Sequence, residues 1–258
     1  MARQIFTLLL LVLSIPSAES QIIKAPAAGA GIVYDRESSI QFRLSTNRGL
    51  AIGAEFGKLR TYYKTTFYQV SLGEIRHPKE QRQSPDPQVG RSFRSYIYGK
   101  RNNLLALRAG WGVKRYFSEK AKQKGVALGV SYTVGPTLGL LKPYHLALCY
   151  PSTDNPGACR IFHQSYSEEN ALIFLDEAGR IKGASAFTRG FKDISLTPGG
   201  NASAAIHMDW GAFDEVVKAL EVGVMLDVFA QKTPILVSEE NQRVFLNFFI
   251  NMQFGKRR

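Results

Sequence analysis

Three side chains in one stretch of the sequence are of the types that carry out acyl transfer: Ser203, His207 and Asp209. A serine attacks as a nucleophile when a histidine takes its proton and a carboxylate orients that histidine. All three are odd positions of the alternating run 202–210, so an extended chain places them on one face. One strand spreads such residues along a line, whereas a triad needs them to converge. We therefore interpret His207 and Asp209 as an internal hydrogen-bonded pair, and we expect no catalytic residue and no enzymatic activity.

Charged side chains also occur on the polar face of other alternating stretches. In 220–228, apolar even positions alternate with a second face that carries Glu221 and Asp227. Inside a narrow ring of strands, such charges would pair and fill the space rather than line a wide aqueous pore. No spacing of histidines resembles a zinc site, so we expect neither a metal nor a cofactor. The predicted internal polar network consists of Glu55, Arg108, Lys114, His207, Asp209, Glu221 and Asp227.

Long strands with a period of two are the elements that would position these residues. Between Val244 and Phe254 every even position is apolar, and the odd positions include Asn251 and Gln253. This alternation is typical of strands rather than helices. We predict ten strands, over 39–46, 49–58, 62–75, 92–100, 103–117, 124–135, 137–149, 201–211, 216–230 and 243–255.

An even number of strands with both chain ends on one side predicts an all-β fold, a closed antiparallel up-and-down transmembrane β-barrel. The strand over 137–149 is the weakest of the ten, because Pro143 cannot donate a ladder hydrogen bond. A barrel of eight strands is the alternative. Residues 135–136, Gly-Pro, and residues 99–103 are the turn signals that would separate neighbouring strands.

The predicted connections alternate in length, as they do when long loops face outward and short turns face the periplasm. The longest, an extracellular loop around 150–200, is too long to lack structure of its own. We expect its segment 171–187 to form a surface hairpin or to pack across the mouth of the barrel. Long connections are predicted near 76–91, 118–123, 150–200 and 231–242, and short ones near 59–61, 100–102, 135–136 and 212–215.

The first twenty residues have the pattern of a secretory signal peptide. Arg3 precedes an apolar run over 5–13, and Pro16 follows it. The run is shorter than the roughly 20 residues of a membrane-spanning helix. We expect residues 1–20 to be removed and residues 21–258 to form the barrel domain. Cys149 and Cys159 could then form a disulfide in the exported chain or remain two thiols; the sequence does not give their separation.

Alternation alone does not distinguish a membrane barrel from a soluble barrel or sandwich, whose apolar face points inward. Run length favours lipid, because a tilted strand needs roughly 9–11 residues to cross a bilayer. Glycines on the second face would also leave room inside a narrow ring. Aromatic residues occur near the ends of several runs, as in the interfacial girdles of membrane barrels: Trp111, Tyr116, Phe117, Tyr132, Trp210, Phe229 and Phe254.

Four stretches that together span most of the mature chain carry a resemblance to a known group: TNRGLAIGAEFGKLRTYYK, IRHPKE with YGKRNN, GVSYTVGPTLGLLKPY, and EVGVMLDVF with NFFINMQFGKRR. On these stretches the chain resembles small, largely uncharacterised outer-membrane β-barrel proteins of the Bacteroidota. The resemblance implies a location in the Gram-negative outer membrane, among its lipid and lipopolysaccharide. It also implies that the barrel-assembly machinery reads the final strand, which ends near Phe254. Some small barrels of this phylum belong to the type IX secretion apparatus, a role to which the resemblance does not extend.

The charge of the chain points to a class of partner. Lys and Arg number 33 against 21 Asp and Glu, a net charge of +12. We find no reader motif or stacking platform for nucleic acid, so we expect none to bind. Anionic lipid headgroups fit better, beside the cations of the predicted outer loops: Arg76, Lys79, Arg82, Lys120, Lys122 and Lys124.

The expected function is structural or interactive. The barrel would present its outer loops to an envelope protein, or serve as an accessory of an envelope or secretion assembly. A narrow channel for ions or small solutes is the alternative, and a membrane-embedded hydrolase or acyltransferase is the third hypothesis.

Overall fold

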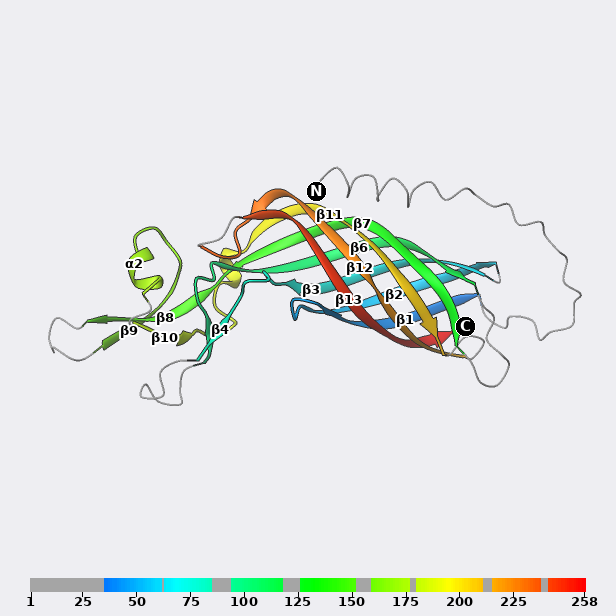
Figure 1. The fold of residues 1–258 in the computed structure, drawn as a ribbon, viewed down its shortest axis with the longest axis horizontal. Coiled ribbons are helices and arrows are strands. Elements are labelled where there is room, and N and C mark those ends of the chain that lie inside the picture. Colours follow the sequence, from blue (N-terminus) through cyan, green and yellow to red (C-terminus); the bar gives the residue numbers. More distant parts are fainter. Residues whose placement is uncertain are drawn as a thin grey trace, which may run out of the picture. The chain divides into compact units, whose positions relative to one another are not determined.

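Eight strands close into a single antiparallel ring (Figure 1). The last strand pairs with the first, with Phe254 opposite Ile40, so the ring has no free edge. The structure confirms an all-β, closed antiparallel fold, and its ring has eight strands, the alternative count, rather than ten. In ring order they are β1 (Arg36–Ser45), β2 (Leu50–Thr61), β3 (Lys64–Ile75), β6 (Asn102–Tyr116), β7 (Ala127–Pro143), β11 (Ser195–Asp209), β12 (Val216–Thr233) and β13 (Gln242–Arg257).

The structure is a computed structural model. The predicted signal peptide and the predicted lipid-binding lysines Lys120, Lys122 and Lys124 lie outside the described residues. The structure describes residues 35–61, 63–84, 94–117, 126–151, 159–176, 180–210, 215–237 and 241–258.

The predicted strand over 92–100 is wrong. Its described part contributes only β5 (Tyr96–Ile97), which pairs with the equally short β4 (Arg82–Gln83) outside the ring. The reason lies in the residue types, because neither alternating face of 92–100 is consistently apolar. A strand without one apolar face has little to gain from joining a ring whose outer surface is apolar.

The predicted turn at Gly135 and Pro136 is also wrong, because β7 runs straight through both residues. Pro136 pairs with Gly200 of β11 on one side. On the other side the pairing with β6 skips the Gly-Pro step. Pro136 cannot donate a backbone hydrogen bond, and the ladder between β7 and β6 has a local gap at this position. As a result the predicted strand 137–149 is divided between the end of β7 and β8 (His145–Pro151), which lies outside the ring.

The two ends of the ring differ. One end, here called the terminal end, carries the start of β1 and the end of β13 together with the ends of β2, β6 and β11 and the starts of β3, β7 and β12. The opposite end, the loop end, carries the tight turn 46–49 and the long connections 76–101, 144–194 and 234–241. The connection predicted as an outer loop at 118–123 lies outside the described residues. The wrong strand over 92–100 reversed the direction assigned to the strand that became β6, which ends at Tyr116 at the terminal end.

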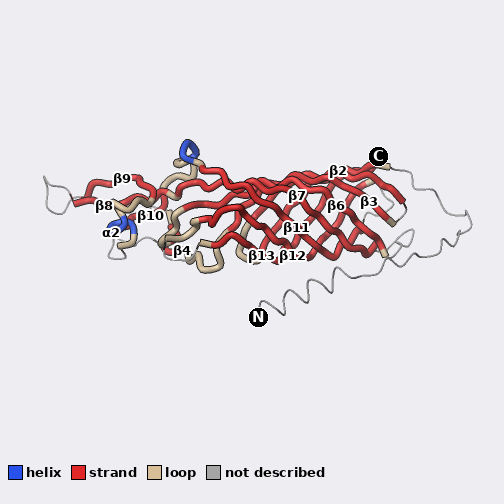
Figure 2. The backbone as a smooth tube through the Cα atoms, turned by 90° about the horizontal axis from the view of Figure 1, so that it is seen from above, coloured by secondary structure: helices blue, strands red, loops and turns tan. Residues whose placement is uncertain are grey.

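A small sheet extends the chain at the loop end (Figure 2). Its order is β10 (Ile181–Ala184), β8, β9 (Cys159–Ser165), and it packs with the short helix α2 (Ala171–Phe174). The 3-10 helix η2 (Phe191–Asp193) leads from it into β11. The predicted surface hairpin over 171–187 is replaced by α2 and β10, with β10 pairing to β8 instead of folding back on its own segment. The apolar core of this sheet consists of Tyr96, Leu146, Leu148, Phe174 and Ile181.

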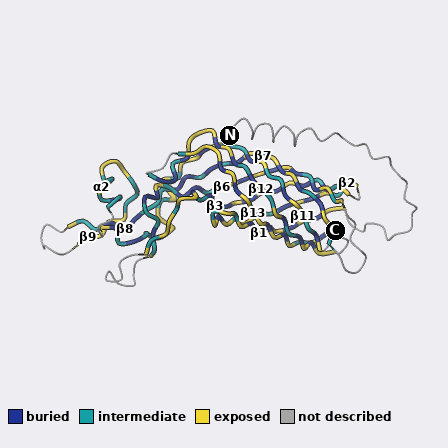
Figure 3. Tube along the Cα trace, viewed as in Figure 1, coloured by how far each residue is buried: buried dark blue, intermediate teal, exposed yellow. Residues whose placement is uncertain are grey.

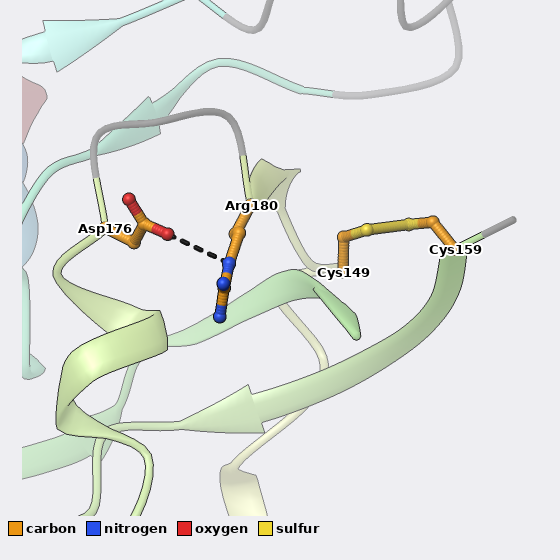
Figure 4. Close-up of a disulfide and its surroundings, with 4 residues drawn as sticks. All are labelled: Cys149, Cys159, Asp176 and Arg180. Carbon is orange, nitrogen blue, oxygen red and sulfur yellow. Dashed lines mark ion pairs between the residues drawn. A yellow bond between two sulfur atoms is a disulfide. The ribbon is translucent and has the colours of Figure 1, made fainter. Parts of the chain in front are cut away.

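A disulfide joins Cys149 of β8 to Cys159 of β9, so the pairing that the sequence left open is formed (Figure 4). Cys149 and Cys159 lie near the far end of the paired strands, where Tyr150 is opposite Arg160. The bridge therefore ties the outermost part of the small sheet. Close to it, the Arg180 guanidinium forms an ion pair of 3.0 Å with Asp176 (Figure 4).

Exposure alternates along the strands of the ring, and the alternation is inverted relative to a water-soluble barrel (Figure 3). Outward residues are apolar and exposed, as in Phe248 at 61% and Ile52 at 53%. Inward residues are polar and buried, as in Asn251 and Gln253. Two of the predicted girdle aromatics, Tyr116 and Phe229, are corrected by this pattern, because their positions on the strands turn them inward.

None of the helices within the described ranges is long and apolar enough to cross a membrane.

Candidate functional site

The interior of the ring is where the structure brings charged side chains together. Side chains alternate across a strand, so every second residue of each strand points inward. The strand register then brings residues that are distant in sequence to the same level of the interior. The structure buries all seven residues of the predicted polar network: Glu55, Arg108, Lys114, His207, Asp209, Glu221 and Asp227.

Lys114 is the centre of the largest group of contacts. Its Nζ donates to the carboxylate of Glu55, to Glu37 Oε1 at 3.2 Å and to Gln253 Oε1 at 3.1 Å. The second oxygen of Glu55 accepts a hydrogen bond from Gln41 Nε2 at 2.6 Å. These residues come from β6, β2, β1 and β13, so a single ammonium group connects strands on both sides of the ring closure.

Arg257, near the end of β13, forms a second group. Its guanidinium donates to the carboxylate of Asp209 and lies 3.5 Å from Glu37. Glu37 therefore links Arg257 to Lys114. Asp209, predicted as the partner of His207, is instead held by the last strand of the ring.

His207 pairs with residues from two other strands, β12 and β6. Its Nδ1 lies 3.0 Å from Glu221 Oε1, and its Nε2 lies 3.3 Å from the Tyr116 hydroxyl. The other oxygen of Glu221 accepts a hydrogen bond from Asn251 Nδ2 at 2.8 Å. The predicted pair of His207 with Asp209 is thus wrong in its partner, although both residues lie inside the ring. A cross-strand neighbour takes the place of the same-strand one, because directly opposite side chains are closer than those two residues apart.

Ser203 does not complete a triad with these residues. It stands four positions before His207 on the same strand, and four steps of about 3.3 Å put the two about 13 Å apart. Nucleophile and base must lie within hydrogen-bond reach to exchange a proton. The contacts of His207 suit a structural pair of histidine and carboxylate.

A third group joins β6 to β12 near the loop end. Arg108 forms two parallel hydrogen bonds with Asp227, from Nε at 2.7 Å and from its terminal nitrogen at 2.9 Å. This fork geometry is the strongest arrangement of an arginine and a carboxylate. Arg43 lies in the same part of the interior, where its guanidinium stacks 4.6 Å from the Phe249 ring centre and donates to the Met225 sulfur.

Several members of this interior escaped the sequence prediction. Glu37, Arg43, Arg257 and Tyr116 are inward-facing partners, and the amides Gln41, Asn251 and Gln253 complete the contacts. The signal that could find them is the alternation itself: along the first and last strands, the residues between the outward apolar positions point inward. The apolar faces of these strands were predicted, but their polar faces were not considered as a source of charge partners.

An apolar cluster closes the interior at the loop end. Leu104, Phe229 and Phe245 point inward there, and Ile235 and Leu236 from the β12–β13 connection pack against them. Phe229 stands two residues beyond Asp227 on the same face, so the cluster begins directly after the last ion pair. Its ring needs the absence of a side chain at Gly139, where a β carbon would come within 2.8 Å of it. We call these residues the cap: Ile75, Leu104, Ala106, Leu141, Phe229, Ile235, Leu236 and Phe245.

Charge balance explains how so many ions are buried. The buried interior contains five carboxylates, four cationic side chains and one histidine. The carboxylates are Glu37, Glu55, Asp209, Glu221 and Asp227, the cations are Arg43, Arg108, Lys114 and Arg257, and the histidine is His207. Removing a charge from water costs several kcal/mol unless a partner and hydrogen bonds compensate. The network therefore acts as a set of cross-links between strands. Within the described ranges, no three His, Cys, Asp or Glu residues are arranged to hold a metal.

Comparison with known proteins adds no relative to this geometry: no family model matches the chain, and no curated protein matches its sequence.

Proposed function

We propose that this chain is an integral outer-membrane β-barrel with a structural or interaction role and no enzymatic activity. It would hold the small sheet of β8, β9 and β10 on the outer side of the membrane, with the loop end outward. The observation that carries the proposal is the inverted ring, with an apolar exterior around an ionic interior.

The width of the apolar exterior supports a membrane. Along β12 every outward position from Leu220 to Ala230 is apolar, and Lys218 and Lys232 stand at the two borders. The ten steps between Leu220 and Ala230 cover roughly 34 Å of strand at about 3.4 Å each. At a tilt of about 45° this is roughly 24 Å, close to the apolar band of about 25 Å in outer-membrane barrels.

The neighbouring strand gives the same width independently. On β13 the outward apolar positions run from Val244 to Phe254, bordered by Gln242 and Lys256. Pairing places Lys218 beside Phe254 and Val224 beside Phe248, so the two runs lie at the same height. A continuous belt, rather than scattered apolar residues, therefore surrounds this side of the ring.

Aromatic residues occupy one level of the belt. Outward-facing Phe56, Tyr68 and Trp111 are direct neighbours on β2, β3 and β6. Each is about half exposed or more. Rows of this kind are typical of the girdles of membrane barrels. Phe56 and Tyr68 were not among the predicted girdle residues, because they lie inside their runs rather than at the ends.

A soluble barrel fits these observations poorly. Such a barrel encloses its apolar face and exposes its polar face. Soluble monomers rarely expose contiguous apolar patches of more than a few hundred Å². Here the apolar belt would stand in water while the ion pairs stayed dry, which is unfavourable on both surfaces.

The filled interior favours a structural role over the narrow channel. The Lys114 and His207 groups cross the ring, and the cap follows at the loop end. We expect the protein to show no discrete conductance in planar bilayers. Stable conductance that changes with Arg108→Gln or Glu221→Gln would support the channel instead.

The small sheet supports a role in interaction. All residues of β9 up to His163 are exposed, and Ile161 and Phe162 are apolar among them. On α2, Leu172 is 90% exposed. The disulfide and the core around Leu148 keep these residues in place.

The two tryptophans test the membrane placement. Both face outward, and the backbone N–H of Trp210 bonds to the carbonyl of Lys218, at the border of the belt. Trp111 lies further in, beside Tyr68. In vesicles with brominated acyl chains, bromine near the headgroup should quench Trp210 most, and bromine deeper in the chain should quench Trp111 most.

Single-tryptophan variants, Trp111→Phe and Trp210→Phe, separate the two signals. The membrane placement would be refuted if neither tryptophan were quenched in the refolded protein, or if the protein were recovered from the soluble fraction of its cells.

The interaction role has its own test, which is replacement of residues 146–184 by a short polar linker. The ring should still form, and cross-links to an envelope protein in the native membrane should disappear.

A further inference from the structure

The loop end of the ring surrounds a cavity of about 1120 Å³. Its walls come from the turn after β1, the connection between β3 and β6, the end of β7 and the segment before η2. Ligand sites in proteins commonly measure about 300–1,000 Å³, so the space is sufficient for a solute or a headgroup of that size. Seven Lys or Arg residues line the cavity, against two glutamates.

The two glutamates are already used by two of these cations. Arg76 pairs with Glu74 at 2.6 Å. The buried Lys100 pairs with Glu80 at 2.9 Å and lies 3.7 Å from Glu74. Glu80 also accepts a hydrogen bond from the backbone N–H of His77, which fixes its loop against the ring. These pairs leave five positive side chains to the cavity.

Four of the five are exposed arginines: Arg48, Arg82, Arg94 and Arg189. In the described part of the chain, none of them forms an ion pair with a carboxylate. Like charges gathered around one space repel each other, and an anion bound between them would remove that repulsion.

The fifth cation, Lys142, is 2% exposed and shapes the wall of the cavity. Its Nζ donates to the carbonyls of Phe187 and Arg189, at 2.7 and 3.3 Å, and lies 3.9 Å from the centre of the Phe187 ring. Gly190 allows the close turn that follows, with φ of 85° and no room for a β carbon beside the Pro143 carbonyl. Lys142 thus anchors the segment that carries Arg189, and among the described residues it forms no ion pair with a carboxylate.

We infer that this cavity binds an anion that carries two or more phosphate groups. A guanidinium matches phosphate with two parallel hydrogen bonds, and a phosphate brings more charge per volume than a carboxylate. The binding itself does not depend on the membrane placement proposed above. Only the source of the phosphates does, since a phosphorylated glycolipid headgroup requires the loop end to lie at a lipid surface.

Sodium tripolyphosphate is the probe for the cavity, titrated calorimetrically into the full chain refolded in a nonionic detergent. We expect saturable binding to one site that weakens as salt is added. Arg189→Gln and Arg94→Gln should each weaken it about tenfold, because each removes a hydrogen bond to a charged group. Both residues are exposed, so the variants should keep the heat-dependent gel mobility of the folded ring.

Arg160→Gln is the matched control. Arg160 is an exposed arginine of β9 outside the cavity, so its loss changes the net charge equally and should leave the affinity unchanged. Absence of binding to the wild-type chain would overturn the inference. So would an equal loss in Arg160→Gln and Arg189→Gln, because binding would then follow net charge alone.

Nanodiscs distinguish the source of the phosphates. The full chain is inserted in phosphatidylcholine discs with or without a diphosphorylated glucosamine lipid, and tripolyphosphate is titrated into both. Reduced tripolyphosphate binding in discs with the glycolipid assigns the cavity to the headgroup. The double variant Arg189→Gln with Arg94→Gln should then bind tripolyphosphate equally weakly in both kinds of disc. Equal binding in the two discs assigns it to a soluble phosphate compound. A protein that binds tripolyphosphate but shows no quenching by brominated lipid would retain the cavity site and lose the membrane proposal.

Discussion

The interior of the ring contains two regions of opposite chemistry that are buried to the same degree. On the terminal-end side of the cap, Lys114, His207 and Arg108 hold carboxylates between strands, whereas the cap around Phe229 and Leu104 is apolar. The cap lies where the exterior changes. Around the ionic region the outward residues are apolar; at the level of Phe229 and Phe245 this belt ends with Ala230 and Val244, and the outer surface then turns polar at Lys232 and Gln242.

The comparison shows how one set of strands can suit two surroundings. Where the outside is apolar, a polar interior is the feature that tells one face of a strand from the other and so fixes the register. Past the border of the belt, at Ile235 and Leu236, the usual arrangement of soluble proteins returns, with apolar residues inside. The strands β7 and β12 pass through both regions without interruption.

The strongest way to break the ionic region is to leave one charge without its partner. Arg108→Met should lower the free energy of unfolding by about 3–5 kcal/mol, because Asp227 is then a buried, uncompensated charge. Urea titration of the protein in phospholipid vesicles measures the loss. The double variant Arg108→Met with Asp227→Leu should recover much of it; a double variant as unstable as the single one would mean that the pair itself carries the stability.

The exterior can be tested by adding a charge to the middle of the belt. Val224→Arg should destabilise the protein by about 2–4 kcal/mol in vesicles, since Val224 lies midway between the two lysine borders of β12. Ala230→Arg, on the same strand and face but beside Lys232, is the control and should cost at most about 1 kcal/mol. Equal effects at the two positions would argue against a bilayer around β12.

The small sheet provides a contrast with the ring, because its core is separate. Replacing Cys149 and Cys159 by serine should destabilise the sheet by about 2–3 kcal/mol through the greater freedom of the opened loop. The unfolding of the ring should not change. Hydrogen exchange of the amides of β8 and β9, compared with those of β12, measures both effects, and faster exchange in β12 would show that the two parts unfold together.

The smallest effects compare two inward positions of the same strand, β3. Ile75→Val in the cap should cost about 1 kcal/mol from lost packing. Ser71→Ala in the ionic region should cost close to nothing, because the buried Ser71 hydroxyl has no hydrogen-bond partner among the described residues. A larger loss for Ser71→Ala than for Ile75→Val would reverse the assignment of the two regions.

The alternation of residue types made most of the ring predictable. The strands that carry Val244, Leu220 and Trp111 were located correctly, as were the seven internal charged residues. The strand count failed at 92–100, which has no consistently apolar face, and at Gly135 and Pro136, where pairing with two long neighbours overrode the local turn preference. Partners such as Glu37 for Lys114 could not be predicted, since they depend on how strands 77 residues apart in sequence come into register.

The cavity at the loop end lay furthest beyond the reach of the sequence. Arg48, Arg94 and Arg189 are isolated cations in separate connections, and no spacing relates them. They share one space only because the ring brings the ends of β1, β3 and β7 together. Arg76 and Arg82, predicted to face headgroups, do line this space, but Arg76 is neutralised by Glu74.

The pairing of β1 with β13 also has a consequence for how the molecule forms. The pairing runs from Glu37 opposite Arg257 to Ser45 opposite Phe249 and joins the first and last strands of the ring, so its contacts are among the most nonlocal in the described chain. Until β13 joins, β1 and β12 are two unpaired edges of the sheet, each a template for aggregation. A folding catalyst that protects the sheet would therefore have to act on β13 and on both of these edges.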